Sequence, residues 1–198
     1  MLNKKERMLF SEELGIKLTK KPSEKELFKW FLAAILFGKP IQFGVAKRTF
    51  QLFILRKLTS PKAILVTGWD RLVELLDLGG YVRYDFSTAT KLLEVMQKLQ
   101  KDYAGSLWKL HESAADSADL EKRLMDFKGI GPVTTNIFLR ELRAVWPKAD
   151  PEPLPAVKEM ARKLKIKLPK NRKADTFIRI EASLIRKWLA SKHKKRQV

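Results

Sequence analysis

The chain of 198 residues is 45% hydrophobic and 10% aromatic, which is enough apolar bulk for one compact domain or two small lobes that share a core. It has no cysteine, which excludes disulfides, cysteine-ligated iron–sulfur clusters and thiol catalysis, and its two histidines are too few for a histidine-rich metal site. The net charge of +19 favours a nucleic acid as partner; an anionic membrane surface and a merely lysine-rich surface are the alternatives.

The spacing of apolar residues is helical almost throughout and predicts an all-α protein of about ten helices with short connections. The predicted helices cover residues 3–14, 22–37, 44–58, 60–65, 69–80, 85–103, 117–127, 132–146, 150–164 and 174–190. No segment alternates between apolar and polar residues as a strand does. The basic tail, residues 191–198, is predicted to be disordered.

Capping residues mark several of the predicted helix ends. Ser23 followed by Glu26 is a capping box at the start of a very apolar helix, which we expect to be buried. Ser60 precedes a proline, which is favoured at the first position of a helix. Asp85 is expected to cap the long helix that follows it. Gly80, the second of two glycines, is typical of a helix C-terminus.

The stretch DFKGIGPVTTN, residues 126–136, joins two predicted helices through Gly129, Ile130 and Gly131, with apolar residues at fixed distances on both sides. We expect both glycines to adopt backbone angles closed to other residues, and Ile130 to fill the gap between the helices. Free N–H groups of the turn and of the next helical turn would then form an anion site suited to a DNA phosphate. The alternative is an ordinary turn between helices, which explains neither the apolar spacing nor the basic chain.

The hairpin, one further helix and then Asp150, 19 residues past the second glycine, resemble the helix-hairpin-helix DNA glycosylase superfamily of the endonuclease III type. Two upstream segments are similar to other parts of that family. LFGKPIQFGVAKRT, residues 36–49, resembles the segment that joins the first two core helices. GGYVRYDFSTATKL, residues 79–92, resembles a turn that carries a DNA-wedging residue. The resemblance covers roughly residues 20 to 165.

The resemblance implies a two-lobed helical fold with a DNA-binding cleft between the lobes. Residues 22–145 would form a six-helix bundle that includes the hairpin. Residues 1–21 together with 146–198 would form the second lobe, which ends in the basic tail. Double-stranded DNA would lie across the hairpin, with one base flipped out of the duplex into the cleft.

Asp150 corresponds to the family's catalytic aspartate. Such a carboxylate stabilises the positive charge that develops on the sugar and orients or deprotonates the attacking water. The residues alone allow another interpretation, in which Asp150 caps a helix that has Pro151 at its first position. The two roles are compatible with each other.

The resemblance also assigns residues to the DNA and to the flipped base. Those expected at the DNA phosphate are Lys128, Gly129, Ile130, Gly131, Val133 and Thr134. Those expected to fill the gap left by the base, or to wedge the opposite strand, are Lys39, Gln42, Tyr81 and Tyr84. Those expected around the base are Phe28, Trp30 and Val133. The alternatives are an ordinary polar loop, half-buried tyrosines and core aromatics. We expect His111 to be a surface or cap residue, and Asp126 and Glu141 to be solvated helix residues and not catalysts.

Bifunctional relatives carry a lysine where this chain has Val133, so lyase chemistry by the usual route is not expected. The implied function is a monofunctional DNA glycosylase of base excision repair that needs no metal or other cofactor. An alkylated purine is mildly favoured as substrate, with deaminated pyrimidines and mispaired adenine still open.

The alternatives in function are a non-catalytic protein that binds damaged or bent DNA, a lyase that uses another lysine, and a basic helical membrane or scaffold protein. The chain has no apolar run of about 18 residues and no apolar core behind its basic N-terminus. We therefore expect a soluble, cytoplasmic protein that is not associated with a membrane. With DNA as its partner, we expect it to be monomeric and associated with the nucleoid.

Overall fold

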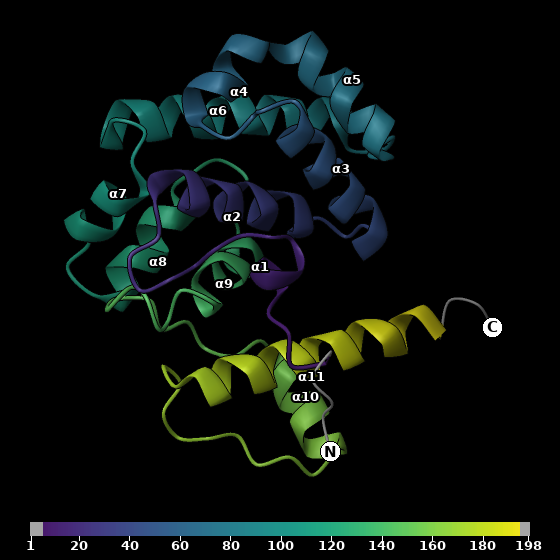
Figure 1. Ribbon diagram of the computed structural model, residues 1–198, viewed down its shortest axis with the longest axis vertical. Coiled ribbons are helices and arrows are strands. Elements are labelled where there is room, and N and C mark those ends of the chain that lie inside the picture. The colour runs from purple at the N-terminus through teal and green to yellow at the C-terminus, as the bar shows by residue number, and fades with distance from the viewer. Residues whose placement is uncertain (1–5, 195–198) are drawn as a thin grey trace.

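In the computed structural model, which describes residues 6–194, the protein is all-α, as predicted (Figure 1). The helices are α1 (Phe10–Glu13), α2 (Glu24–Phe37), α3 (Phe43–Leu55), α4 (Pro61–Thr67), α5 (Trp69–Gly79), α6 (Asp85–Tyr103), α7 (Leu107–Ser113), α8 (Ser117–Met125), α9 (Pro132–Arg140), α10 (Pro155–Lys163) and α11 (Asp175–Lys194). No strand occurs within the described range. No helix in that range is both long enough and apolar enough to cross a membrane.

The predicted helix ends at Ser23, Ser60 and Gly80 are confirmed. The hydroxyl of Ser23 accepts from the amide of Glu26 (3.3 Å), and the hydroxyl of Ser60 accepts from an amide in the first turn of α4 (3.2 Å). Gly80 ends α5 with a left-handed φ of 98°. The capping box is only half formed, because the carboxylate of Glu26 accepts from the amide of Lys17 (2.7 Å) instead of the amide of Ser23.

Two helix predictions differ from the structure at the ends of the chain. The helix predicted over residues 3–14 is reduced to the four residues of α1, and residues 3–5 lie outside the described range. The helix predicted to end at residue 190 continues to Lys194, so the prediction of disorder is wrong for residues 191–194. The remainder of that tail lies outside the described residues.

Two further predictions fail on local grounds. The apolar spacing did not reveal α7, because a helix of seven residues spans only two turns. Its start is nevertheless marked by Ser106, whose hydroxyl accepts from the amide of Lys109 (3.0 Å). Asp85 is the first residue of α6 and not its cap. The Asp85 carboxylate accepts from the amide of Phe86 (2.8 Å), one residue along the chain.

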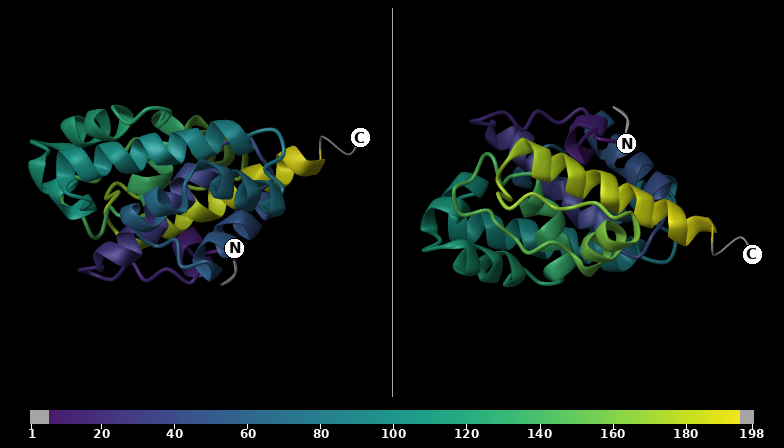
Figure 2. Two further views of the ribbon diagram at one scale, coloured as in Figure 1. Left: turned by 90° about the horizontal axis from the view of Figure 1, so that it is seen from above. Right: turned by 90° about the horizontal axis from the view of Figure 1, so that it is seen from below.

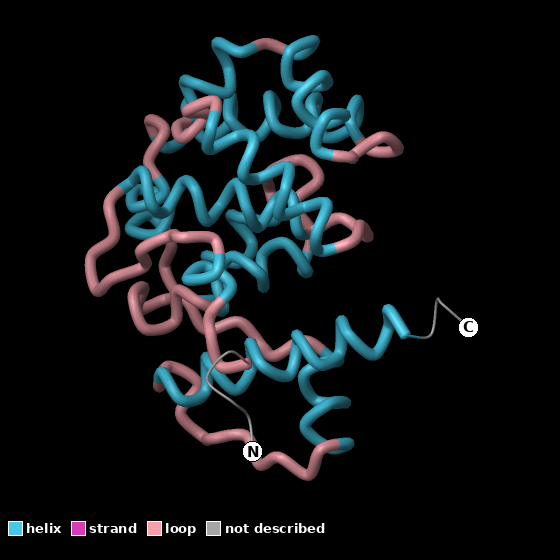
Figure 3. Tube along the Cα trace, turned by 45° about the vertical axis from the view of Figure 1, so that its right-hand side comes forward, coloured by secondary structure: helices cyan, strands magenta, loops and turns pink. Residues whose placement is uncertain are grey.

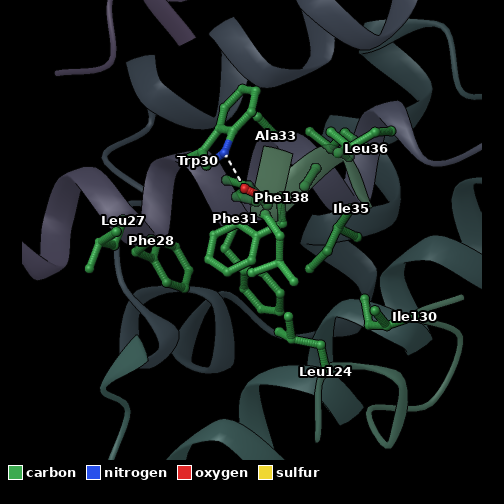
Figure 4. Packing of buried hydrophobic residues seen from close by; sticks show 14 of the residues in the cluster. Leu27, Phe28, Trp30, Phe31, Ala33, Ile35, Leu36, Leu124, Ile130 and Phe138 are labelled. Atoms are coloured by element: carbon green, nitrogen blue, oxygen red, sulfur yellow. Dashed lines mark hydrogen bonds between the residues drawn. The ribbon is translucent and has the colours of Figure 1, made fainter. Parts of the chain in front are cut away.

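The very apolar helix α2 lies at the centre of the fold, where it packs against α3, α7 and α9 (Figures 1 and 4). The indole N–H of Trp30 donates to the carbonyl of Phe138 on α9 (2.9 Å). The ring of Phe31 meets the rings of Phe127 and Phe138 with centroid distances of 6.1 and 5.1 Å. Burying a side chain of this kind contributes about 1.5–3 kcal/mol. The core therefore fixes α9 relative to α2.

The two ends of the molecule are built from different helices. Helices α4, α5 and α6 pack together at one end, and α10 and α11 pack together at the other (Figures 1 and 3). The view from below in Figure 2 shows α11, in yellow, crossing that face of the molecule. Ion pairs join α11 to α1, from Arg186 to Glu13 (2.5 Å) and from Arg179 to Glu12 (2.7 Å).

Candidate functional site

The turn between α8 and α9 has the geometry expected of Gly129 and Ile130. Gly129 has a φ of 75°, in the left-handed region that favours glycine. A Cβ at this position would lie 3.1 Å from Cδ of Lys91. Ile130 is buried in the hydrophobic core, and its amide donates to the carbonyl of Phe127 (2.9 Å) (Figure 4). The turn is therefore held in place by Lys91 at Gly129 and by the hydrophobic core at Ile130.

The prediction for Gly131 is wrong. Its φ of −103° and ψ of −179° are open to every residue. A Cβ at this position would meet no atom within 4 Å. The space over Gly131 is thus left free by the protein and is open to an approaching molecule.

The first turn of α9 carries backbone N–H groups without a partner. Pro132 has no N–H, and Thr135 donates to the carbonyl of Gly131 (3.0 Å). The amides of Gly131, Val133 and Thr134 donate to no group in the part of the chain that the structure describes. Unpaired amides at a helix N-terminus, together with the helix dipole, bind anions such as phosphate.

Two lysines flank the turn, and only one of them has a free ammonium group. Nζ of Lys128 lies 2.6 Å from the carboxylate of Glu94. Lys91 on α6 is only 7% exposed, packs its methylene groups on Gly129, and makes no hydrogen bond or ion pair within the described chain. Burial, aided by the nearby charge of Lys39, lowers its pKa to about 8. The sequence analysis missed this residue; its only signal was a place within the apolar stripe of α6.

A cavity of about 580 Å³ lies where α9 meets α1, α11 and the connection between α2 and α3. This volume is typical of ligand pockets, which occupy about 300–1,000 Å³. The cavity has an aromatic wall of Phe10, Trp30, Phe37, Phe43 and Trp188. Among residues 6–194, the charged residues that line it are Lys39, Arg140 and Lys192, and none of the lining residues is acidic.

Four predicted site residues from three segments line this cavity: Trp30 of α2, Lys39 and Gln42 of the following connection, and Val133 of α9. A close approach holds the connection against α9. A Cβ at Gly38 would lie 2.1 Å from Oγ1 of Thr134, so only glycine fits there. The side chain of Thr134 is buried by this contact, which leaves only its amide available to a ligand.

Three other aromatic predictions have different outcomes. Phe28 is buried in the core and does not line the cavity. The wedge prediction is wrong for Tyr81, which is fully buried, donates its hydroxyl to the carbonyl of Leu36, and has its pKa raised by burial. Tyr84 is half-buried, with its ring centroid 5.7 Å from Nζ of Lys39. Of the two tyrosines, only Tyr84 lies beside the cavity residues.

Asp150 lies in the irregular segment between α9 and α10. The prediction that it caps a helix is wrong, because α10 begins at Pro155 with Leu154 as its N-cap. The Asp150 side chain is 28% exposed; its Oδ2 lies 2.8 Å from Nη2 of Arg172, and its Oδ1 lies 3.6 Å from Nε of Arg143. The carboxylate does not line the cavity, whereas Leu154 from the same segment does.

The two arginines give the carboxylate of Asp150 a defined position. Arg143 is fully buried, pairs with Glu181 on α11, and donates to a backbone carbonyl of the same irregular segment (2.6 Å). Arg172 pairs with both Asp150 and Glu152. These hydrogen bonds raise the pKa of Arg172 and lower the pKa of Glu152. Asp150 is thus a negative group held between cations.

His111, predicted to be a surface or cap residue, and Glu141, predicted to be solvated, are both buried. The ring of His111 stacks on Trp146 at a centroid distance of 4.7 Å, and burial lowers its pKa to about 4. The carboxylate of Glu141 accepts from the first two amides of α1 (2.9 and 3.0 Å) and thereby anchors that helix. Both contacts join segments far apart in the chain, which local patterns do not reveal. Asp126 is exposed, as predicted, and pairs with a lysine of α6 (2.8 Å).

No protein-family model matches this chain, and no curated protein matches it at a significant level. Within residues 6–194, no three His, Asp or Glu side chains are grouped so that they could hold a metal ion. The distinguishing feature of the site is the meeting of unpaired amides, a free lysine and an aromatic cavity around the start of α9.

Proposed function

We propose that the protein is a monofunctional DNA glycosylase of the helix-hairpin-helix type. It binds double-stranded DNA, flips a damaged or mismatched base out of the duplex and hydrolyses the N-glycosidic bond of that base. The observation that carries the proposal is that one helical turn presents both unpaired amides and a residue of the cavity lining. Its unpaired amides at Gly131, Val133 and Thr134 suit a phosphate, and the side chain of Val133 lines the aromatic cavity.

The cavity also supports the two-lobed arrangement that the resemblance implies. Trp30 and Val133 line it from the expected bundle, residues 22–145. Phe10 and Trp188 line it from the expected second lobe, residues 1–21 with 146–198. A strand held by the start of α9 would therefore run along the boundary between the lobes, where an extruded base can enter the cavity.

The chemistry requires little beyond a carboxylate and water. When the bond between C1′ and the base nitrogen breaks, its electron pair leaves with the base and positive charge develops on the sugar. Asp150 is the carboxylate that stabilises this charge. Water adds to C1′ and loses a proton, which balances the proton that the departing base takes up. Val133 has no amine with which to form a Schiff base, so the product is an unbroken strand with an abasic site.

The test is a strand-cleavage panel with end-labelled duplexes, each carrying one lesion. The lesions are 3-methyladenine, 7-methylguanine, hypoxanthine, uracil opposite guanine, 8-oxoguanine, and adenine opposite 8-oxoguanine. Cleavage that appears only after alkali, and that Asp150→Asn abolishes, is the expected result. Asp126→Asn is the matched control, because Asp126 is an exposed aspartate that pairs with Lys98 outside the cavity.

Other outcomes of the panel are equally informative. Cleavage by the wild type without alkali contradicts the monofunctional proposal; trapping with borohydride would then identify the lysine used. Excision that survives in Asp150→Asn contradicts the catalytic role of Asp150 but not the glycosylase proposal. An absence of excision from every duplex contradicts the glycosylase proposal itself.

A second candidate function is binding of damaged or bent DNA without catalysis. One observation favours it: the carboxylate of Asp150 is engaged by Arg172 and Arg143 and does not line the cavity. Asp150→Asn leaves duplex binding intact under both functions, so binding by this variant does not separate them. Tight binding of a lesion by the wild type, without excision after prolonged incubation, decides for this second function.

A further inference from the structure

Arg140 on α9 is a buried cation that lacks a hydrogen-bond or ion-pair partner among the described residues. It is 5% exposed, and its guanidinium makes no hydrogen bond or ion pair within the described chain. Its nearest aromatic contact is the ring of Phe10, whose centroid lies 5.0 Å from Cζ. Arg143, one turn further on, is equally buried but pairs with Glu181. A buried charge that lacks hydrogen-bond partners is costly, which is why buried arginines are usually paired.

The acidic groups nearest to Arg140 are already engaged. Glu141 accepts from two amides of α1, and Glu181 pairs with Arg143. Both carboxylates act on Arg140 only through their charge, and burial still lowers its pKa. The guanidinium therefore remains a cation with unused donors.

Arg140 also lines the aromatic cavity, where the other charges have the same sign. Lys39 and Lys192 line it too, and Nζ of Lys192 lies 5.4 Å from the ring centroid of Trp188. Because none of the described lining residues is acidic, the cavity opposes a positively charged ligand and favours one with hydrogen-bond acceptors. The aromatic wall, in which Phe43 contacts Phe10 and Phe37 at tilted angles, suits a planar ring system.

We propose that the cavity accepts a neutral 6-oxopurine, whose O6 and N7 both accept hydrogen bonds from the fork of Arg140. This inference rests on the proposed glycosylase function and names its substrate class, with hypoxanthine in DNA as the representative lesion. Arginine recognises the same pair of acceptors on guanine in duplex DNA. Guanine paired with cytosine is protected, because flipping a well-paired base costs more than flipping a mispaired one.

The inference replaces the alkylated purine that the sequence favoured. A 7-methylguanine or 3-methyladenine nucleotide brings positive charge into a cavity lined by three cations. In 8-oxoguanine N7 carries a hydrogen and is a hydrogen-bond donor. It therefore cannot accept a hydrogen bond from Arg140. Hypoxanthine has neither defect. The order of preference is therefore hypoxanthine before both kinds of modified purine.

The test measures single-turnover excision from three duplexes. The first carries hypoxanthine opposite thymine, the second carries 7-methylguanine, and the third carries 8-oxoguanine. Hypoxanthine is expected to be excised fastest. Arg140→Met is expected to slow that excision roughly ten- to hundredfold, the usual discrimination of one bidentate contact. Arg71→Met is the matched control, since Arg71 is an exposed arginine on α5 that pairs with Glu74. Arg140→Lys keeps the charge without the fork and should also lose most of the rate.

If 7-methylguanine or 8-oxoguanine is excised faster than hypoxanthine, the inference is overturned and the proposed function stands. The same holds if Arg140→Lys excises hypoxanthine at the rate of the wild type. If Arg140→Met does not fold, Arg140→Lys decides alone. If no lesion is excised, the proposed function fails, and equilibrium dialysis with free hypoxanthine tests the cavity by itself. Binding by the wild type that is lost in Arg140→Lys supports the cavity assignment, and absent or unchanged binding overturns it.

Discussion

Nη2 of Arg172 lies 2.8 Å from Oδ2 of Asp150, so the carboxylate proposed to act in catalysis is bound to a half-buried arginine 22 residues further along the chain. Arg172 belongs to the connection between α10 and α11, and it also pairs with Glu152. The position of Asp150 is thus set jointly by its own segment and by the segment that leads into α11.

We expect Arg172→Met to slow excision by roughly tenfold while duplex affinity is unchanged, because misplacing a catalytic group mainly lowers the chemical rate. Partly exposed ion pairs contribute about 0–1 kcal/mol, so the free energy of unfolding should fall by no more than that. Single-turnover rates, duplex titration and urea unfolding check the three parts. A rate equal to that of the wild type would mean that Arg143 alone positions Asp150.

The two glycines of the hairpin should respond differently to alanine. In Gly129→Ala the alanine must adopt a φ of 75°, and its Cβ crowds the side chain of Lys91. We therefore expect this substitution to lower the free energy of unfolding by about 1 kcal/mol or more. Gly131→Ala has an ordinary φ and open space, so stability should be preserved. Its Cβ nevertheless stands where a phosphate would approach, so duplex affinity should fall.

Urea unfolding and duplex titration at one fixed salt concentration separate these effects, since phosphate contacts are salt-dependent. Full duplex affinity in Gly131→Ala would contradict the assignment of the phosphate to this turn. Unchanged stability in Gly129→Ala would contradict the tight packing on Lys91.

Lys91 makes stability depend on pH in the alkaline range. Its pKa is about 8 in the folded protein and about 10.4 in an unfolded chain, so the unfolded state holds more protons between these values. This group therefore makes the free energy of unfolding rise as pH increases from 8 towards 10.4. Lys91→Met should be more stable than the wild type at pH 7, and that advantage should shrink by pH 10. An advantage that does not change with pH would contradict the burial of the charged group.

His111 has the corresponding effect in acid. Burial lowers its pKa from about 6.5 to about 4, so the unfolded chain binds a proton at a pH where the folded protein does not. Its contribution to stability is present above pH 6.5 and is lost as the pH falls towards 4. His111→Phe keeps a ring against Trp146 and should lose less stability between pH 7 and pH 4 than the wild type. Thermal unfolding of both proteins across that range is the measurement, and parallel curves would contradict the prediction.

Local patterns predicted much of the fold because helix ends depend on adjacent residues. The hydroxyls of Ser23 and Ser60 accept from amides only three residues away. Gly80 and Gly129 can adopt a left-handed φ because glycine has no Cβ. The same reasoning failed at Asp85, where the side chain bonds within its own dipeptide instead of capping the helix. It also failed at Gly131, because a glycine does not by itself require a left-handed φ.

The amino-acid sequence by itself determined the all-α class, most of the helices, and the Gly129-Ile130 turn, since these follow from apolar spacing and short-range capping. Only the tertiary structure decided which charges are paired. Asp150 and Arg172 form an ion pair, whereas Arg140 and Lys91 are buried and have no hydrogen bond or ion pair within residues 6–194. Such pairing depends on contacts between segments tens of residues apart, which are created when helices pack and which no local pattern contains.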